Sequence, residues 1–289
     1  MKMNLEETAL SSAGLPDRDD FTPVELLAGR PDAAALFLCD HASNAVPKTY
    51  GSLGLPPEQF ARHIAWDIGA ADVTRALAAM FEAPAVLSRF SRLLIDPNRG
   101  ADDPTLVMRI SDGALIPANA HIDDTEITRR TQQYWQPYRD AAAAQLDRMT
   151  TNGIPPAIVS IHSFTPIWRG TPRPWQIGLL WDGDARLAQA LMGELEAQPD
   201  LTIGDNEPYD GALEGDTLYD LGTMRGIPHI LIEIRQDLIA TQAGAQAWAG
   251  RIALALKPAL ARAGIRMIER HPSHARSQSR RPALTRTRA

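Results

Sequence analysis

The sequence predicts an α/β fold of three layers, in which helices cover both faces of a mixed, largely parallel central sheet. Three observations lead to this class. Short continuous apolar runs, typical of strands buried on both faces, recur along the chain. Amphipathic stretches of helical length separate them, and turn-forming residues lie between the two kinds of segment. Strands that alternate with helices in this way build a sheet sandwiched between helical layers.

The expected strands are short runs dominated by apolar residues. The first clear one is AAALFLC, residues 33–39, and it stops at Asp40 and His41. Later runs with the same character predict strands at residues 85–87, 92–95, 156–161, 176–181 and 228–234. Near the N-terminus, FTPVELL (residues 21–27) could form a further short element.

The expected helices follow from apolar residues at helical spacing and from end signals. They are predicted at residues 68–82, 123–149, 185–197, 217–225 and 241–263. Asp124 is a suitable N-cap for the second helix. Gly226 and Gly264 are suited to end the last two. The stretch from 100 to 119 is rich in Asp, Pro and Gly, and its length indicates a functional loop.

Length and composition indicate one globular domain with two polar ends. The 289 residues are 44% hydrophobic and 22% charged, as in soluble proteins. We expect a polar lead-in over 1–30, one catalytic domain over 31–266 and a disordered Arg-rich tail over 267–289. The single cysteine, Cys39, cannot form an internal disulfide. With no signal peptide and no apolar run of membrane-spanning length, the sequence predicts a cytoplasmic protein.

The charge distribution argues against a polyanionic partner. The chain has 29 basic and 35 acidic residues, a formal net charge of -6. Residues 269–289 hold six Arg and one Glu and carry +5, so the rest of the chain carries -11. An acidic body does not favour binding to nucleic acid or to an anionic membrane surface. We interpret the basic tail as a solvated segment.

Polar side chains follow four of the predicted strands. They belong to Asp40-His41, Asp96 to Arg99, His162-Ser163 and Glu233 to Arg235. In open α/β sheets, ligand sites lie beyond the carboxyl ends of the strands. Two histidines with a nearby Asp and a Glu are the residue types of a catalytic zinc site, which needs about three N or O ligands and a carboxylate that moves the proton. No H-E-x-x-H motif is present.

Five segments resemble one known family in content and order. They are LFLCDHASNAVP (36–47), HIAWDIGA (63–70), SRLLIDPNRG (91–100), VSIHSFTP (159–166) and ILIEIRQDL (230–238). Together they resemble the N-formylglutamate amidohydrolase family, part of the zinc-carboxypeptidase-like hydrolases that include succinylglutamate desuccinylase and aspartoacylase. The resemblance spans about residues 30–262.

The resemblance implies a zinc ion bound by His41, Asp67 and His162. In the wider group the first histidine belongs to an H-x-x-E element whose carboxylate also binds the metal. Here that position is Asn44, a poorer ligand, so the sequence leaves open whether Asn44 or Asp67 completes the site. Asp67 could instead cap the helix expected from residue 68.

The remaining implied roles concern substrate and proton transfer. Asn98 and Arg99 match an N-R element that binds the substrate carboxylate, and a guanidinium suits this task because it donates two parallel hydrogen bonds. The alternative is that both are turn residues. Glu233 matches the general base, the alternative being a salt bridge with Arg235 or another Arg. Arg92 or Arg169 could stabilise the oxyanion.

Three functions are consistent with these residues. The resemblance favours a zinc-dependent amidohydrolase that converts N-formyl-L-glutamate and water to glutamate and formate, in histidine catabolism. A carboxypeptidase-like or other deacylase with a different substrate would share the metal and base. A non-catalytic protein that binds an acidic metabolite would fit the loss of the ligand at Asn44. Catalysis by Cys39 is disfavoured because a cysteine in a buried strand acts as a small hydrophobe. The oligomeric state is left open.

Overall fold

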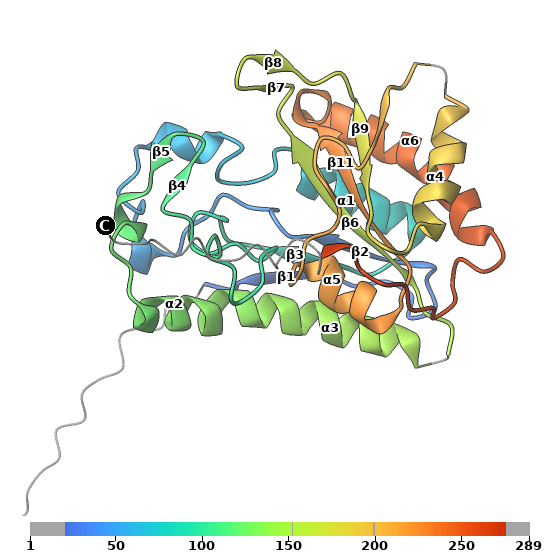
Figure 1. Cartoon of the computed structure of the whole chain (residues 1–289), viewed down its shortest axis with the longest axis horizontal. Coiled ribbons are helices and arrows are strands. Elements are labelled where there is room, and N and C mark those ends of the chain that lie inside the picture. Colours follow the sequence, from blue (N-terminus) through green and yellow to red (C-terminus); the bar gives the residue numbers. More distant parts are fainter. Residues whose placement is uncertain (1–20, 152, 199, 276–289) are drawn as a thin grey trace, which may run out of the picture.

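The computed structural model describes residues 21–151, 153–198 and 200–275, and a seven-stranded sheet lies at its centre (Figure 1). The strands lie in the order β1-β3-β2-β6-β11-β9-β10. Their bounds are β1 Val24–Leu27, β2 Ala35–Cys39, β3 Ala85–Ser88, β6 Ala157–Phe164, β9 Ile177–Leu180, β10 Ile203–Asp205 and β11 His229–Arg235.

The four middle strands, β3, β2, β6 and β11, run parallel to one another. At one edge β1 pairs antiparallel with β3. At the other edge β9 is antiparallel to β11, and β10 is parallel to β9. The sheet is therefore mixed with a parallel centre, and the predicted α/β class is confirmed. The apolar runs of β2 and β6 are buried along their whole length, as strands between two helical layers must be.

Helices pack on both faces of the sheet. On one face α1 (Ala70–Phe81) and α4 (Arg186–Glu196) pack against α6 (Gln242–Ala261). On the other face lie α3 (Gln136–Thr150), which runs along the lower side of Figure 1, and the short α5 (Thr217–Leu221). Short 3-10 turns occur at Lys48–Tyr50, Pro57–Ala61, Pro117–Asn119, Thr223–Arg225 and Gln236–Leu238.

The helix predicted over 123–149 is built from three pieces. A first helix, α2 (Asp124–Arg130), continues through a π-helical turn at Thr131–Trp135 into α3. The predicted cap is wrong by one residue: Asp123, and not Asp124, accepts the hydrogen bond from the backbone N–H of Glu126, at 2.8 Å. Asp123 has the extended backbone that a capping residue needs, whereas Asp124 is already helical.

The strand predicted at 92–95 is wrong. The segment is buried, but it forms a turn. Its neighbours explain this: Ser91 N–H donates to the carbonyl of Ala45 and Arg92 N–H to that of Ala65, so loops and not strands satisfy its backbone. The apolar run LLI therefore indicates a buried segment, but it does not distinguish a buried turn from a buried strand.

The structure also contains short strands that the sequence did not predict. The functional loop over 100–119 contains a small hairpin of β4 (Ile110–Ser111) and β5 (Ala114–Leu115), which lies beyond the end of the main sheet in Figure 1. A second small hairpin, β7 (Ile167–Trp168) and β8 (Thr171–Pro172), follows β6. The edge strand β10 was not predicted, because its short sequence IGD lacks an apolar run.

Both predicted polar ends contain ordered structure. Within the lead-in, the FTPVELL segment supplies strand β1. At the other end the expected disorder is wrong for residues 267–275: Glu269 N–H donates to the carbonyl of Gly226 at 2.7 Å, Arg186 donates to the carbonyl of Met267 at 3.2 Å, and Ala275 is buried. The rest of the predicted tail, 276–289, and residues 1–20 lie outside the described residues.

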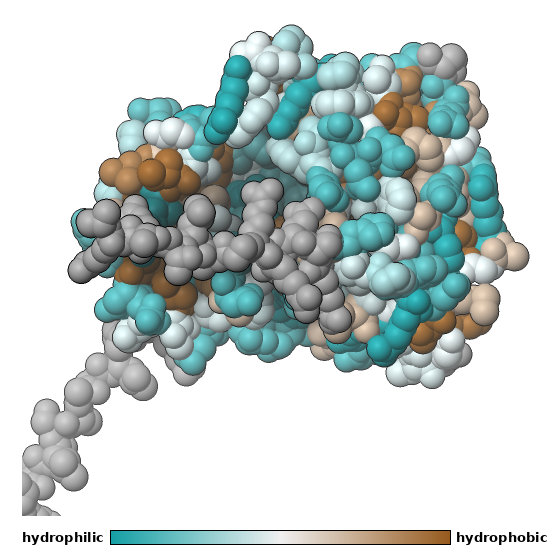
Figure 2. Space-filling model, viewed as in Figure 1, coloured by the Kyte–Doolittle hydropathy of each residue, from teal (hydrophilic) through white to brown (hydrophobic). Residues whose placement is uncertain are grey.

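The surface shows no extended apolar face in the view of Figure 2, where hydrophilic residues predominate and hydrophobic ones form separate small groups. Such scattered groups are ordinary for a globular protein. In the described part of the chain, no helix has the length and apolarity that crossing a bilayer requires.

One backbone position at the start of α1 tolerates only glycine. Gly69 precedes α1 with φ +81°, and a Cβ there would lie 2.1 Å from the carbonyl oxygen of Ile239. We predict that Gly69→Ala lowers the free energy of unfolding by about 2–3 kcal/mol, because strain and a backbone clash combine.

The matched control is Gly250→Ala in α6, where a Cβ meets no atom within 4 Å. That change should raise the free energy of unfolding by about 0.5–1 kcal/mol, since alanine favours the helix. Urea denaturation measures both. Equal effects of the two substitutions would contradict the account of Gly69.

Candidate metal centre and active site

The sheet brings three of the predicted residues to the same region. His41 follows Asp40 just past the end of β2, His162 lies inside β6 and Glu233 inside β11. In the register of the two parallel strands, Glu233 lies opposite His162. Both strands extend past their apolar runs, so these polar residues are part of the ladder. Asp67 comes from the loop before α1, and its N–H donates to the carbonyl of His41 at 2.9 Å.

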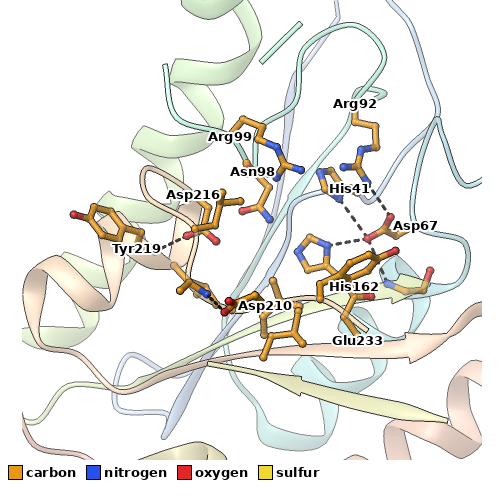
Figure 3. A pocket seen from close by; sticks show the side chains of 18 of the residues that line it. His41, Asp67, Arg92, Asn98, Arg99, His162, Asp210, Asp216, Tyr219 and Glu233 are labelled. Atoms are coloured by element: carbon orange, nitrogen blue, oxygen red, sulfur yellow. Dashed lines mark hydrogen bonds and ion pairs between the residues drawn. The ribbon is translucent and has the colours of Figure 1, made fainter. Parts of the chain in front are cut away.

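His41, Asp67 and His162 converge on one point (Figure 3). Asp67 Oδ2 lies 2.8 Å from His162 Nδ1 and 3.3 Å from His41 Nδ1, and all three side chains are buried. The one ligand atom that each offers lies within 4.8 Å of the other two. The second oxygen, Asp67 Oδ1, is buried and accepts no hydrogen bond. Two imidazole nitrogens and one carboxylate oxygen are a donor set that fits zinc.

The outer nitrogens of both histidines face buried carboxylates. His41 Nε2 lies 2.7 Å from Asp96 Oδ1, and His162 Nε2 lies 3.1 Å from Asp40 Oδ2. A carboxylate that accepts Nε2–H leaves the Nδ1 lone pair directed inward, which is the common arrangement behind metal-binding histidines. The fold therefore brings the two histidines together and also places a carboxylate behind each of them.

Asp40 is itself held by hydroxyl groups from three elements. It accepts hydrogen bonds from Thr217 (2.6 Å), Ser160 (2.8 Å) and Tyr138 (3.1 Å). Burial opposes its ionisation, but the hydrogen bond and charge of His162 hold the pKa of Asp40 below its usual range. For Asp96, burial is likewise outweighed by the charge of Arg92, so the pKa of Asp96 lies well below its usual range. Both groups are thus carboxylates at neutral pH.

Sequence reasoning did not assign roles to Asp40 and Asp96, although it noted both at strand ends. The available signal was their place in the polar clusters Asp40-His41 and Asp96 to Arg99. Which carboxylate supports which histidine depends on the fold, because Asp96 is 55 residues from His41 and Asp40 is 122 residues from His162.

The capping alternative for Asp67 is wrong. The first helical residue is Ala70, its N-cap is Gly69, and no side chain caps this end. The Asp67 carboxylate faces the two histidines and also accepts a hydrogen bond from the N–H of Ser163, at 3.3 Å. Asn44 is not in this cluster, because its side-chain amide donates to the carbonyl of Phe60 at 2.7 Å.

Glu233 lies beside the cluster without a bonding partner. Its Oε2 is buried and has no hydrogen bond, and the residue is only 6% exposed. Burial raises the pKa of Glu233 to about 8, with the charge of Asp67 adding to the shift and that of His162 opposing it. The salt bridge with Arg235 is not present, since Arg235 pairs with Asp237 at 2.9 Å. A carboxyl poised near neutral pH is suited to accept and return a proton.

A cavity of about 430 Å³ opens onto these groups, and Arg92, Asn98 and Arg99 line it. Arg92 Nη2 lies 3.0 Å from Asp96 Oδ2. The buried Nε of Arg92 has no hydrogen bond. Arg99 donates through Nη1 to the carbonyl of Asn98, at 2.9 Å. The Asn98 amide oxygen accepts from the N–H of Thr217 at 3.2 Å, so the pair is anchored and not only part of a turn.

Arg169, which the sequence suggests as a possible oxyanion stabiliser, is not among the residues that line this cavity. Arg169 is exposed in the turn of the β7–β8 hairpin, with its guanidinium 5.6 Å from the ring centre of Trp168. The basic residue near this hairpin that the sequence reasoning missed is Arg173. It is 9% exposed and donates to the hydroxyl of Tyr209, a cavity residue, at 3.1 Å.

Two further histidines, His63 and His229, line the cavity. His63 Nδ1 lies 3.5 Å from Asp67 Oδ1, and burial lowers the pKa of His63 to about 4. Its spacing of four residues from Asp67 was the available signal. Asp112, from the predicted functional loop, forms part of the cavity wall.

The chain is similar to known proteins in sequence and in structure. The family model described as N-formylglutamate amidohydrolase matches residues 33–240. A gene product of Agrobacterium tumefaciens of known structure is 34% identical, with a TM-score of 0.78, and the match covers 83% of this chain and 95% of that one. A search of curated protein sequences gives no match.

The crystal structure of N-formylglutamate amidohydrolase from Ralstonia eutropha JMP134 is 20% identical, with a TM-score of 0.64, and covers 83% of this chain and 97% of that one. This second likeness shows a shared fold. The family match extends over most of the chain, including β2, β6, β11 and every residue of the His-Asp-His cluster. The chain therefore belongs to the N-formylglutamate amidohydrolase family, which consists of hydrolases that act on carbon–nitrogen bonds.

Proposed function

We propose that this protein is a zinc-dependent amidohydrolase that removes the acyl group from a small N-acyl amino acid. The leading candidate reaction is N-formyl-L-glutamate and water to glutamate and formate. One observation carries the proposal: a buried donor set of two imidazoles and a carboxylate faces the same cavity as an unpaired carboxyl, Glu233. A cytoplasmic location and a role in histidine catabolism are parts of this proposal.

His41, Asp67 and His162 would hold the metal. When bound in such a site, zinc acts as a Lewis acid and brings the pKa of water to about 7. Asp40 and Asp96 would keep the two imidazoles in the required tautomer, and their contacts with Nε2 support this role.

The chain's own residues then supply orientation and proton transfer. Asn98 and Arg99 bind the substrate carboxylate at one side of the two histidines, and Glu233 lies on the other side (Figure 3). Glu233 accepts a proton from the attacking water and returns it to the amine nitrogen as the carbon–nitrogen bond breaks. The unpaired Nε of Arg92 is a donor for the charge that develops on the carbonyl oxygen.

The proposal is tested by metal analysis of the purified protein and by formate release from N-formyl-L-glutamate and N-formyl-L-aspartate. A chelator should abolish formate release and added zinc should restore it. A protein that hydrolyses no N-acyl amino acid after zinc reconstitution would refute the proposed activity.

Replacing Glu233 by Gln should reduce kcat by about 10²–10⁴-fold while zinc remains bound, because the substitution removes a proton acceptor that is not a ligand. Steady-state kinetics and zinc content measure the two effects. The matched control is Asp237→Asn, an exposed carboxylate just after the same strand, which should leave kcat unchanged. Full turnover by the Glu233 variant would remove Glu233 from the role of base.

Replacing Asp40 or Asp96 by Asn should weaken zinc binding by about 10–100-fold, because each carboxylate orients one histidine. Competition with a chromophoric chelator measures the affinity. Asp124→Asn, at the exposed start of α2, is the control and should not change it. Unaltered zinc affinity in both buried variants would show that these contacts do not support a metal site.

A further inference from the structure

The cavity continues past Glu233 along the sheet. Side chains two apart on a strand share a face, so His229, Leu231 and Glu233 of β11 point the same way, and all three line the cavity. On the antiparallel neighbour β9, Leu180 lies opposite Leu231 and Gly178 opposite Glu233. At about 3.3 Å per residue, His229 lies roughly 13 Å along the strand from Glu233.

This extension, which we name the β9–β11 trench, has apolar walls. Leu180 and Leu231 form its floor, and both are at least nine-tenths buried. Leu218 of α5 and Leu213 of the segment before it cover this floor, while Asp182 follows β9 and His229 begins β11. The residues that define the trench are Leu180, Asp182, Leu213, Leu218, His229 and Leu231.

Specific contacts enclose the trench. The side-chain oxygen of Asn206 accepts hydrogen bonds from Trp181 N–H (2.9 Å) and Gly211 N–H (3.2 Å), which fixes the loop after β10 against the end of β9. A Cβ at Gly211 would lie 2.3 Å from Trp181 N, so the two backbones touch. At the far end, the N–H of His274 donates to Asp182 Oδ1 at 2.8 Å.

The cations that line the cavity lie at one of its ends. Among the described lining residues, the Lys and Arg side chains are Arg92 and Arg99, and both belong to the catalytic end. Asp182 is the lining carboxylate within the trench, whereas Asp67 and Glu233 belong to the catalytic end. A second substrate carboxylate in the trench would be buried without a lining cation and close to Asp182, which is costly.

We propose that the β9–β11 trench binds an uncharged apolar arm of the substrate, so that the preferred substrates are N-acyl amino acids with one carboxylate and one extended apolar group. The inference rests on the proposed hydrolysis of an N-acyl amino acid, and within that class it ranks N-formyl-L-glutamate below substrates with an apolar arm. The arm belongs to either the amino-acid side chain or the acyl group, since both extend from the amide bond that is cleaved. The volume agrees, because 430 Å³ lies within the range of about 300–1,000 Å³ that holds ligands larger than a formylated glutamate.

The test compares kcat/KM of the zinc-loaded protein for three substrates. N-formyl-L-glutamate is the reference, N-formyl-L-norleucine carries an apolar side chain, and N-hexanoyl-L-alanine carries an apolar acyl chain. We expect at least one apolar substrate to exceed the reference by about 10-fold or more, and which one does so identifies the arm. A clear preference for N-formyl-L-glutamate over both would overturn the inference while leaving the proposed function intact. No hydrolysis of any of the three would refute the function itself.

A variant locates the effect in the trench. Leu213 is half-buried and lies in the loop after β10 that covers the trench. A substitution there does not disturb the sheet. Leu213→Lys should lower kcat/KM for the better apolar substrate by about 10-fold or more and change that for N-formyl-L-glutamate far less. Leu254→Lys, at a residue 76% exposed on α6, is the matched control and should alter neither value. Equal loss for all substrates in the Leu213 variant would show that the trench does not select an apolar arm.

Discussion

Two buried carboxylates that fix two histidines are the interaction on which the rest of the structure depends. Asp40 joins the end of β2 to β6, α3 and α5 through four side-chain contacts, and Asp96 joins the loop after β3 to His41. Burying ionised groups is costly unless every one of them is paired. Here hydroxyl groups, imidazoles and the Arg92 guanidinium provide that pairing, so the packing of several elements and the aim of both histidines are set together.

The same network also positions positive charge in the cavity. The protein carries a formal charge of -6, which does not attract an anionic substrate from a distance. Arg92 and Arg99 create a local positive region beside the histidines, where they act over short distances in a partly buried site. Because Asp67 and Asp96 contact Arg92 at its terminal nitrogens, that guanidinium is held in place, and its buried Nε has no hydrogen bond. In the proposed function, capture of a carboxylate and stabilisation of an oxyanion therefore fall to a region built by the fold.

Chemistry and selectivity come from different parts of the sheet. The parallel strands β2, β6 and β11 deliver the histidines and Glu233 at their carboxyl ends, as expected for an open α/β sheet. The antiparallel strand β9 runs beside β11 and turns the neighbouring face into an enclosed trench. Membership of the family accounts for the first part. The second part depends on the side chains that this chain places along β9, β11 and the loop after β10, and we propose that it selects which amides fit.

By itself the sequence determined the α/β class, most strands and helices, and the residue types of the site, because apolar runs and polar strand ends are local patterns. It could not identify the turn at residues 92–95, since burial looks alike in a turn and a strand. It also misplaced Arg169 and gave no role to Asp40, Asp96 or His63. Only the tertiary structure decided these, because contacts such as His162 with Asp40 and His41 with Asp96 join residues far apart in the chain. Strand register and loop packing set which polar groups meet, and no local pattern encodes a distance between two strands.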